Sequence, residues 1–245
     1  EKELGILIAD AAELAWQHNR VQRTDFLDPH EQKVAKSVLS ALSEVNVLTY
    51  GGYRQAERAR LVIYPQYYLV ETIESPIRVM EATGNFNFAK VTHRDFLGSI
   101  LGLGIKREKI GDLIVTSSGC QVIIASEIAD YVLQQWDKVH QVPITVNEID
   151  QEQLAIEPER VKEIKCTVAS MRLDAIAAFG FGTSRTKMAR EIKNDRVKIN
   201  WKSTTNPSIE VREGDVISIR GRGRVIVEQV NGTTKKGRIG LLLRR

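Results

Sequence analysis

Residues 182–200 read GTSRTKMAREIKNDRVKIN and carry six basic side chains against two acidic ones. Thr183 or Ser184 can cap a helix that starts here, because a hydroxyl oxygen accepts a free backbone N–H of the first helical turn. Met188 and Ile192 fall on one face of this helix, which leaves the basic residues on its other sides. The stretch therefore predicts a short helix with one buried face and a basic surface.

A basic strand follows the helix directly. In RVKIN, Val197 and Ile199 alternate with Arg196 and Lys198, as expected for a strand with one buried face. A helix N-terminus presents free N–H groups and a partial positive charge to anions, and the basic side chains continue that charge along the helix. A merely solvated helix face would normally mix in more acidic residues at a spacing of four. We therefore interpret this surface as a binding site for a nucleic-acid backbone.

Further basic residues extend the candidate surface. A helix over SMRLDAIAAFG places Leu173 and Ile176 inward, and RGRGR at 220–224 forms a turn whose glycines can let the backbone approach a phosphate. We expect the basic residues on one continuous face, with Trp201 as the only aromatic nearby. The candidate residues are Arg172, Ser184, Arg185, Lys187, Arg190, Lys193, Arg196, Lys198, Arg220, Arg222 and Arg224.

The charge of the whole chain is distributed unevenly. Residues 161–245 hold 19 Lys and Arg against 8 Asp and Glu, a net of +11, whereas residues 1–160 have a net of −7. A basic third joined to an acidic remainder favours a polyanion-binding module at the C-terminal end. No apolar run approaches the roughly 18 residues of a membrane span.

The rest of the chain predicts two further modules and an α+β fold class. Residues 1–74 read as a small α/β domain, with Asp28 as cap of a second helix and a strand that stops at Pro65. Residues 75–150 follow the order βαββαβ of ferredoxin-like domains, which RNA-recognition motifs share. Thr92 and Ser126 are the expected helix caps there. The strand CQVIIAS has no aromatic for base stacking, so the topology alone does not indicate RNA binding.

The C-terminal part is expected to start after a polar connector. Residues 151–164 form this connector, and residues 165–245 form the basic domain. In the basic domain, NPSIEV and GDVISIRGRGRVIVEQV read as short strands. A turn at Asn231 and Gly232 is followed by a basic tail that includes Lys235 and Lys236.

Residues 172–224 carry the motifs RLD, SR before a helix, RVKIN, PS-x-x-V-x-x-GD and RG-x-GR. In this order they resemble the S-four RNA-binding domain; Asp195 departs from the Gly that many members have before the strand. The three-part layout, FLGSILGLGIKREKIGDLIV in the middle and TKKGR near the end resemble the YlmH family. Its cyanobacterial and plastid members are called photosystem II S-four domain proteins.

The resemblance implies a non-enzymatic protein that binds structured ribosomal RNA or tRNA through this surface. It implies a monomeric, ribosome-associated factor that acts on stalled large subunits, with no cofactor, metal or membrane partner. The implied location is the cytoplasm, or the plastid stroma if the source is a plant or an alga.

An RNA-modifying enzyme with an S-four targeting domain is the alternative, with its active site within residues 1–150. MRLDAIAAFG lacks the first Gly of the G-R-L-D motif of pseudouridine synthases, so we expect Asp174 to be a first-turn residue that favours the helix dipole. No P-loop and no glycine-rich strand-to-helix loop is present. Cys120 and Cys166 form no CxxC pair, and the four histidines show no metal-ligand spacing.

Overall fold

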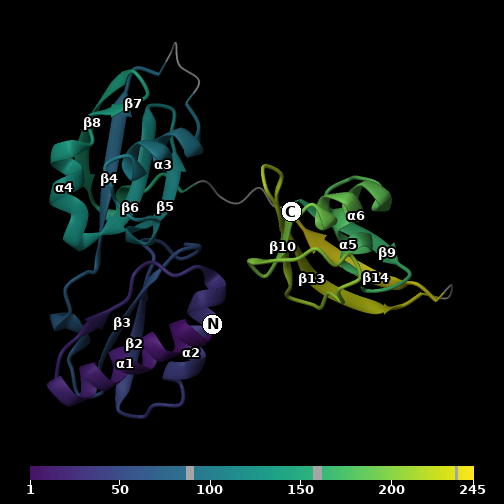
Figure 1. The fold of residues 1–245 in the computed structure, drawn as a ribbon, viewed down its shortest axis with the longest axis horizontal. Coiled ribbons are helices and arrows are strands. Elements are labelled where there is room, and N and C mark those ends of the chain that lie inside the picture. Colours follow the sequence, from purple (N-terminus) through teal and green to yellow (C-terminus); the bar gives the residue numbers. More distant parts are fainter. Residues whose placement is uncertain (87–90, 157–161, 235–236) are drawn as a thin grey trace. The chain divides into compact units, whose positions relative to one another are not determined.

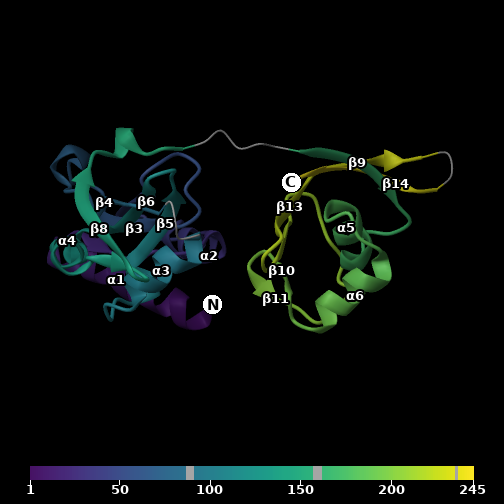
Figure 2. The ribbon, with the colours of Figure 1, turned by 90° about the horizontal axis from the view of Figure 1, so that it is seen from above.

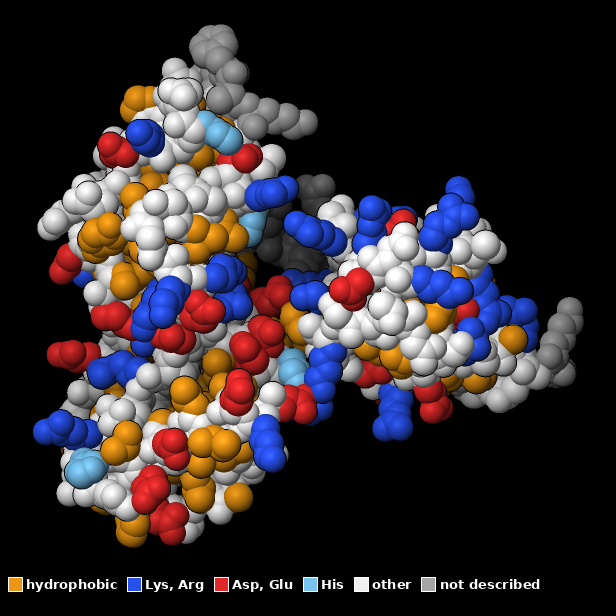
Figure 3. Space-filling view, viewed as in Figure 1, with side chains coloured by type: hydrophobic (Ala, Val, Ile, Leu, Met, Phe, Trp, Pro, Cys, Tyr) orange, Lys and Arg blue, Asp and Glu red, His pale blue; other side chains and the backbone are white. Residues whose placement is uncertain are grey.

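The computed structural model describes residues 1–86, 91–156, 162–234 and 237–245. The chain divides into two compact units, Glu1–Glu157 and Pro158–Arg245 (Figure 1). Lys and Arg side chains are dense on the surface of unit 2, whereas unit 1 shows many Asp and Glu side chains (Figure 3). The three domain boundaries expected from the sequence stay predictions. Residues 157–161 of the expected connector lie outside the described residues, as do Lys235 and Lys236 of the expected tail.

Unit 1 begins with two helices on a small antiparallel sheet. Helices α1 (Lys2–His18) and α2 (Pro29–Leu39) pack on strands in the order β1-β3-β2, with bounds Gln22–Arg23, Arg60–Pro65 and Val45–Tyr50. The predicted start of α2 is confirmed: Asp28 accepts the backbone N–H of Glu31 at 2.9 Å, and Pro29 occupies the first turn. Ile8, Leu39 and Ile63 are among the side chains that form the core.

The second half of unit 1 has the predicted ferredoxin-like order. Its sheet runs β5-β6-β4-β8-β7, and α3 (His93–Leu101) and α4 (Ala129–Gln135) lie on one face of it (Figure 2). The predicted cap Thr92 forms a capping box with Asp95. The strands are β4 (Ile77–Gly84), β5 (Ile110–Val115), β6 (Gly119–Ala125), β7 (Lys138–Val139) and β8 (Val142–Ile149).

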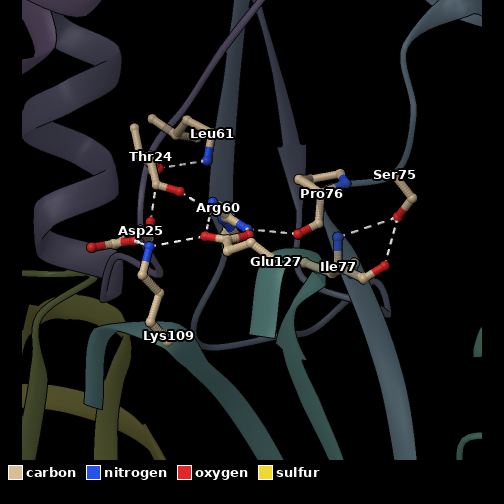
Figure 4. A network of polar contacts seen from close by, with 9 residues as sticks. All are labelled: Thr24, Asp25, Arg60, Leu61, Ser75, Pro76, Ile77, Lys109 and Glu127. Atoms are coloured by element: carbon tan, nitrogen blue, oxygen red, sulfur yellow. Dashed lines mark hydrogen bonds and ion pairs between the residues drawn. The ribbon is translucent and has the colours of Figure 1, made fainter. Parts of the chain in front are cut away.

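A buried arginine joins the two halves of unit 1. Arg60 on β3 is 3% exposed and donates to the carbonyls of Thr24 and Pro76 and to the Glu127 carboxylate (Figure 4). Lys109 donates to the same carboxylate at 2.9 Å and also reaches Asp25. Burial raises the pKa of Glu127, but the hydrogen bonds from Arg60 and Lys109 outweigh it and bring the pKa to about 2. The carboxylate therefore stays ionised between its two cations.

Unit 2 is a curved six-stranded sheet around two helices. Helices α5 (Leu173–Gly180) and α6 (Arg185–Lys193) pack on strands in the order β11-β10-β12-β13-β14-β9. The side chains expected inward, from Leu173 to Ile199, are buried in or packed against this core. The strands are β9 (Glu163–Val168), β10 (Val197–Ile199), β11 (Lys202–Ser203), β12 (Val216–Ile219), β13 (Gly223–Thr233) and β14 (Ile239–Arg244).

Two expectations about the end of the chain are wrong. Strand β13 continues through Asn231 and Gly232, and the turn closes later, where the N–H of Thr234 donates to the Arg238 carbonyl at 2.7 Å. The expected tail is strand β14, which pairs with β13 and β9 because Leu241 and Leu243 enter the core. The last two residues of the expected connector, Glu163 and Ile164, belong to β9.

Two local expectations are also wrong, for identifiable reasons. Residues 206–211 form only an isolated bridge at Glu210, because the carbonyls of Pro207 and Ile209 accept the first free N–H groups of α5. Ser126 does not cap α4. It opens the short 3₁₀ helix Ser126–Ile128, and its own N–H donates to Pro76 at 3.0 Å.

Candidate nucleic-acid interface

The start of α6 has the geometry expected of an anion-facing helix end. Ser184 caps the helix, and its hydroxyl oxygen accepts the backbone N–H of Lys187 at 3.3 Å. The first turn contains no acidic residue. Met188 and Ile192 are buried, so Lys187, Arg190 and Lys193 are exposed on the remaining sides. The positive end of the helix dipole and the basic side chains therefore both favour the binding of an anion.

A buried carboxylate binds the two arginines nearest this end. Asp174 lies in the first turn of α5, as expected, and accepts both Nε and Nη2 of Arg172, at 3.1 and 2.9 Å. Arg185 Nη2 lies 3.1 Å from Asp174 Oδ1. Burial raises the pKa of Asp174, but the bonds from Arg172 and Arg185 outweigh it, so the pKa is lowered. The arrangement fixes one guanidinium from each helix start at a single point and leaves both partly exposed.

The RGRGR turn lies beside the α5–α6 connection. Arg222 donates to the Phe181 carbonyl at 2.8 Å, and its guanidinium lies 5.7 Å from the Phe181 ring centroid. The backbone N–H of Arg220 donates to the carbonyl of Arg196 at 3.3 Å. Gly221 and Gly223 have φ of 78° and 82°, so glycine is needed here for the turn itself. Arg196, Arg220 and Arg222 therefore lie near the helix pair.

Two of the predicted residues lie on the opposite side of the sheet. Lys198, Ser218 and Arg224 are in register across β10, β12 and β13. Each alternates with residues that enter the core, such as Val197 and Val225, so these three point away from the helices. The expectation of one continuous face is therefore wrong for Lys198 and Arg224. Strand alternation in the sequence indicated which side chains are buried, but not that α5 and α6 both lie on that side.

Two further residues near the candidate surface were not predicted from the sequence. The guanidinium of Arg245 lies 5.4 Å from the Phe181 ring centroid, beside Arg222. Phe179 on α5 is 45% exposed, so Trp201 is not the only aromatic of this region. Arg245 was assigned to a tail; the alternation of Ile239, Leu241 and Leu243 was the signal that could have placed it at the end of a strand.

Two other kinds of site, a metal centre and a membrane span, are absent from the described residues. In the four described ranges, no three His, Cys, Asp or Glu side chains are arranged so that they could hold a metal ion. No helix in these parts of the chain combines the length and apolar character needed to cross a membrane.

Three family models match consecutive parts of the chain. The model described as "YlmH, N-terminal" matches residues 7–68, and "Putative RNA-binding domain in YlmH" matches residues 72–153. The S4 domain model matches residues 171–217. This last match includes Asp174 and the whole of α6 but ends before the RGRGR turn.

Two known proteins resemble all or part of the chain. Ribosome-associated protein quality control protein P2 of Bacillus subtilis (strain 168) is 37% identical over 217 residues, which are 89% of this chain and 84% of the relative. Small ribosomal subunit protein uS4 of Desulfotalea psychrophila is 36% identical over 70 residues, 27% of this chain and 33% of that protein.

A solved structure shares the fold. The cell division protein ylmH from Streptococcus pneumoniae superposes with a TM-score of 0.51 at 23% identity, covering 62% of this chain and 91% of its own. The resemblance inferred from the motifs is thus confirmed over most of the sequence. The chain contains an N-terminal YlmH module, a central YlmH module and an S4 domain, in that order. It therefore belongs to the YlmH family.

Proposed function

We propose that this protein binds structured RNA, ribosomal RNA or tRNA, through the helix edge of its S4 domain, and that it acts as a ribosome-associated factor without catalysing a reaction. The helix edge comprises Arg172, Ser184, Arg185, Lys187, Arg190 and Lys193, with Arg196, Arg220 and Arg222 beside it. The observation that carries the proposal is the arginine pair that Asp174 holds where both helices begin. Lys198 and Arg224 contribute less, because they point to the other side of the sheet.

The physical basis is recognition of phosphates and shape. Guanidinium groups fixed by a carboxylate lose little further conformational freedom when they meet a phosphate. Exposed lysines on α6 add counterion release, which makes the affinity depend on salt. A rigid array of cations fits the regular phosphate spacing of folded RNA better than a flexible single strand.

The name of the Bacillus subtilis relative suggests the biological setting. That protein is a ribosome-associated protein quality control protein. We propose the same role here, on large ribosomal subunits that have stalled, for a monomeric protein of the cytoplasm. Because this relative is bacterial, we do not propose the plastid stroma.

Cosedimentation tests the role directly. The full chain should pellet with large ribosomal subunits, and Lys187→Gln with Arg190→Gln should reduce the bound fraction at least about tenfold. The matched control is Lys33→Gln with Lys36→Gln, two exposed lysines on α2. Equal loss in both double variants would contradict the assignment. Equal affinity for a hairpin and an unstructured strand of the same length would contradict recognition of folded RNA.

A further inference from the structure

The sheet of the ferredoxin-like half cannot bind RNA in the way this topology commonly does. RNA-recognition motifs stack bases on side chains of the central strands, on the face away from the helices. Here those strands are β4 and β6, and Val79, Gln121 and Ile123 on that face are 1%, 4% and 0% exposed. Any RNA contact of this half must therefore use another surface.

Residues that precede and follow the ferredoxin-like half in the sequence cover the face of its sheet that is turned away from the helices. Phe26 packs into the cluster that contains Val79 and Ile123. The side chain of Gln121 donates to Glu81 and to the Gln153 carbonyl, and accepts the N–H of Ala155 at 2.6 Å. These contacts are part of the core of unit 1, so bases could not displace them without partial unfolding.

Two arginines meet at one edge of this half. Arg58 Nε donates to the carbonyl of Ile110 at 3.2 Å, and Arg107 Nη1 donates to the same oxygen. Arg58 is fixed further by a 2.6 Å bond from Nη2 to the Phe26 carbonyl. Two guanidinium groups that share one neutral acceptor repel each other, and this repulsion favours binding of an anion between or beside them.

Asp112, the acidic residue with the largest electrostatic effect on Arg107, is hydrogen-bonded to other groups. Asp112 accepts the hydroxyl of Tyr53 at 2.8 Å and the backbone N–H groups of Glu57 and Arg58 at 2.6 and 3.1 Å. Among the described residues, Nε and Nη2 of Arg107 donate to no acceptor, and neither is sealed from solvent. Arg107 therefore has donors available for a ligand.

The electrostatic environment agrees with this geometry. Burial and the charge of Arg58 lower the pKa of Arg107 to about 10, and the nearby Asp112, Glu108 and Glu57 offset this only in part. Partial burial and the charge of Arg107 also lower the pKa of His93, at the start of α3. The charged forms of Arg107 and His93 are thus less stable here than in water, and a bound anion would stabilise them.

We propose that Arg107, with His93 and the exposed Lys106 beside it, binds a backbone phosphate of structured RNA, so that unit 1 contacts RNA at this edge and not through its sheet. The proposal rests on the RNA-binding function proposed above and adds a second contact to it. Asp95 at the same helix start does not compete, because Thr92 and His140 engage its carboxylate.

The imidazole of His93 serves as the reporter for this site. The full chain is labelled on histidine, the His93 resonance is identified with His93→Gln, and its pKa is measured by NMR titration. A structured RNA hairpin should raise the His93 pKa, and this rise should be absent in Arg107→Gln. Inorganic phosphate, added alone, tests whether a free phosphate is sufficient.

Affinity provides the second readout. Arg107→Gln and Lys106→Gln should each weaken binding of the full chain to structured RNA about tenfold, the loss expected for one charge-assisted contact. Lys138→Gln, an exposed lysine on β7 of the same half, should stay within about twofold. Lys106 is included because, within the described parts of the chain, its side chain forms no hydrogen bond that its removal would break, whereas Arg107 supports the loop.

The outcomes separate this inference from the proposed function. If the wild type binds RNA and the α6 variant loses binding while Arg107→Gln and Lys106→Gln bind normally, only this inference is overturned. A His93 shift with phosphate but not with RNA would assign the site to a small phosphate compound and overturn it as well. Failure of the wild type to bind any structured RNA would overturn both.

Discussion

At the scale of single residues, Asp174 determines where two arginines lie. A carboxylate that is 6% exposed in its side chain is unfavourable without partners, and Arg172 and Arg185 supply them. The arginines in turn keep a fixed position near the start of α6, where a phosphate would bind. Asp174 is therefore a positioning residue, and its removal should affect stability and RNA binding through different routes.

Asp174→Asn should lower the free energy of unfolding of unit 2 by about 1–3 kcal/mol near neutral pH, since two guanidinium groups lose a charged partner. A carboxyl whose pKa is lowered on folding contributes fully above its ordinary pKa of 3.8 and loses that contribution as the pH falls below it. The wild-type advantage should therefore shrink in acid. Urea unfolding of both proteins, followed by tryptophan fluorescence, measures it; an advantage that persists unchanged in acid would contradict the pairing.

Trp201 lies in a backbone conformation that glycine favours. Asn200 and Trp201 have φ of 48° and 65° in the two-residue turn between β10 and β11. Left-handed backbone costs a side-chain-bearing residue roughly 1 kcal/mol. Because Trp201 is also half-buried, the packing of its side chain offsets this backbone cost.

At the scale of elements, strand β14 holds the six-stranded sheet of unit 2 together, because it lies between β13 and β9. Its neighbours are β13 and β9, which lie far apart in the sequence, and its buried side chains are Leu241 and Leu243. Deleting the last residues should thus disrupt the sheet. A tail, as expected from the sequence, could be removed without that effect.

Leu243→Ala should cost about 3 kcal/mol of stability, the usual loss for a buried leucine. Leu242→Ala is the matched control, because this neighbour on β14 points to the other side and is only partly buried. Chemical denaturation of the full chain compares the two. Equal effects would mean that β14 is not inserted in the sheet as described.

The charged group around Glu127 joins elements from both halves of unit 1. Glu127→Gln should cost about 1–3 kcal/mol, since the buried Arg60 loses an ionised acceptor. The carboxylate contributes fully above its ordinary pKa of 4.5, and the contribution disappears as the pH falls toward about 2. Urea titrations across that interval should show the variant and the wild type converging. A constant gap would contradict the ion pair.

The outcome for the elements shows what local sequence can predict. Helices α2 and α6 were predicted with their caps, because Asp28 and Ser184 act on neighbouring N–H groups. Strands β9 and β14 were missed, because their partners are distant and their flanking residues are polar or basic. The side of the sheet on which Lys198 and Arg224 lie depends on where α5 and α6 pack, which is a tertiary property.

Ion pairs between side chains on different elements also could not be predicted from the sequence. RLD and SR were recognised as motifs, but nothing local indicates that Asp174 binds Arg185 across the α5–α6 connection. Asp195 illustrates the opposite case. It adopts a φ of 55° where a glycine was expected, and aspartate tolerates this conformation better than most residues, so the turn before β10 is preserved.

At the scale of the whole molecule, the two units carry opposite net charge. Residues 1–160 have a net of −7 and residues 161–245 a net of +11. Long-range attraction to RNA therefore comes from unit 2, and it should weaken with salt because phosphate contacts release counterions. The net negative charge of unit 1 opposes the approach of polyanions over most of its surface, so we expect a phosphate contact there only at a local basic group such as Arg107.

The salt dependence of RNA affinity tests the central claim most directly, because its slope reports the number of phosphate contacts. The full chain and a triple variant, Lys187→Gln with Arg190→Gln and Lys193→Gln, are titrated with one structured RNA over a range of salt concentrations. The slope of log affinity against log salt should become shallower by about 2–3, since each of the three lost phosphate contacts contributes roughly 0.7–0.9. Lys33→Gln with Lys36→Gln should leave it unchanged. An unaltered slope in the triple variant would contradict RNA binding through the S4 helix edge.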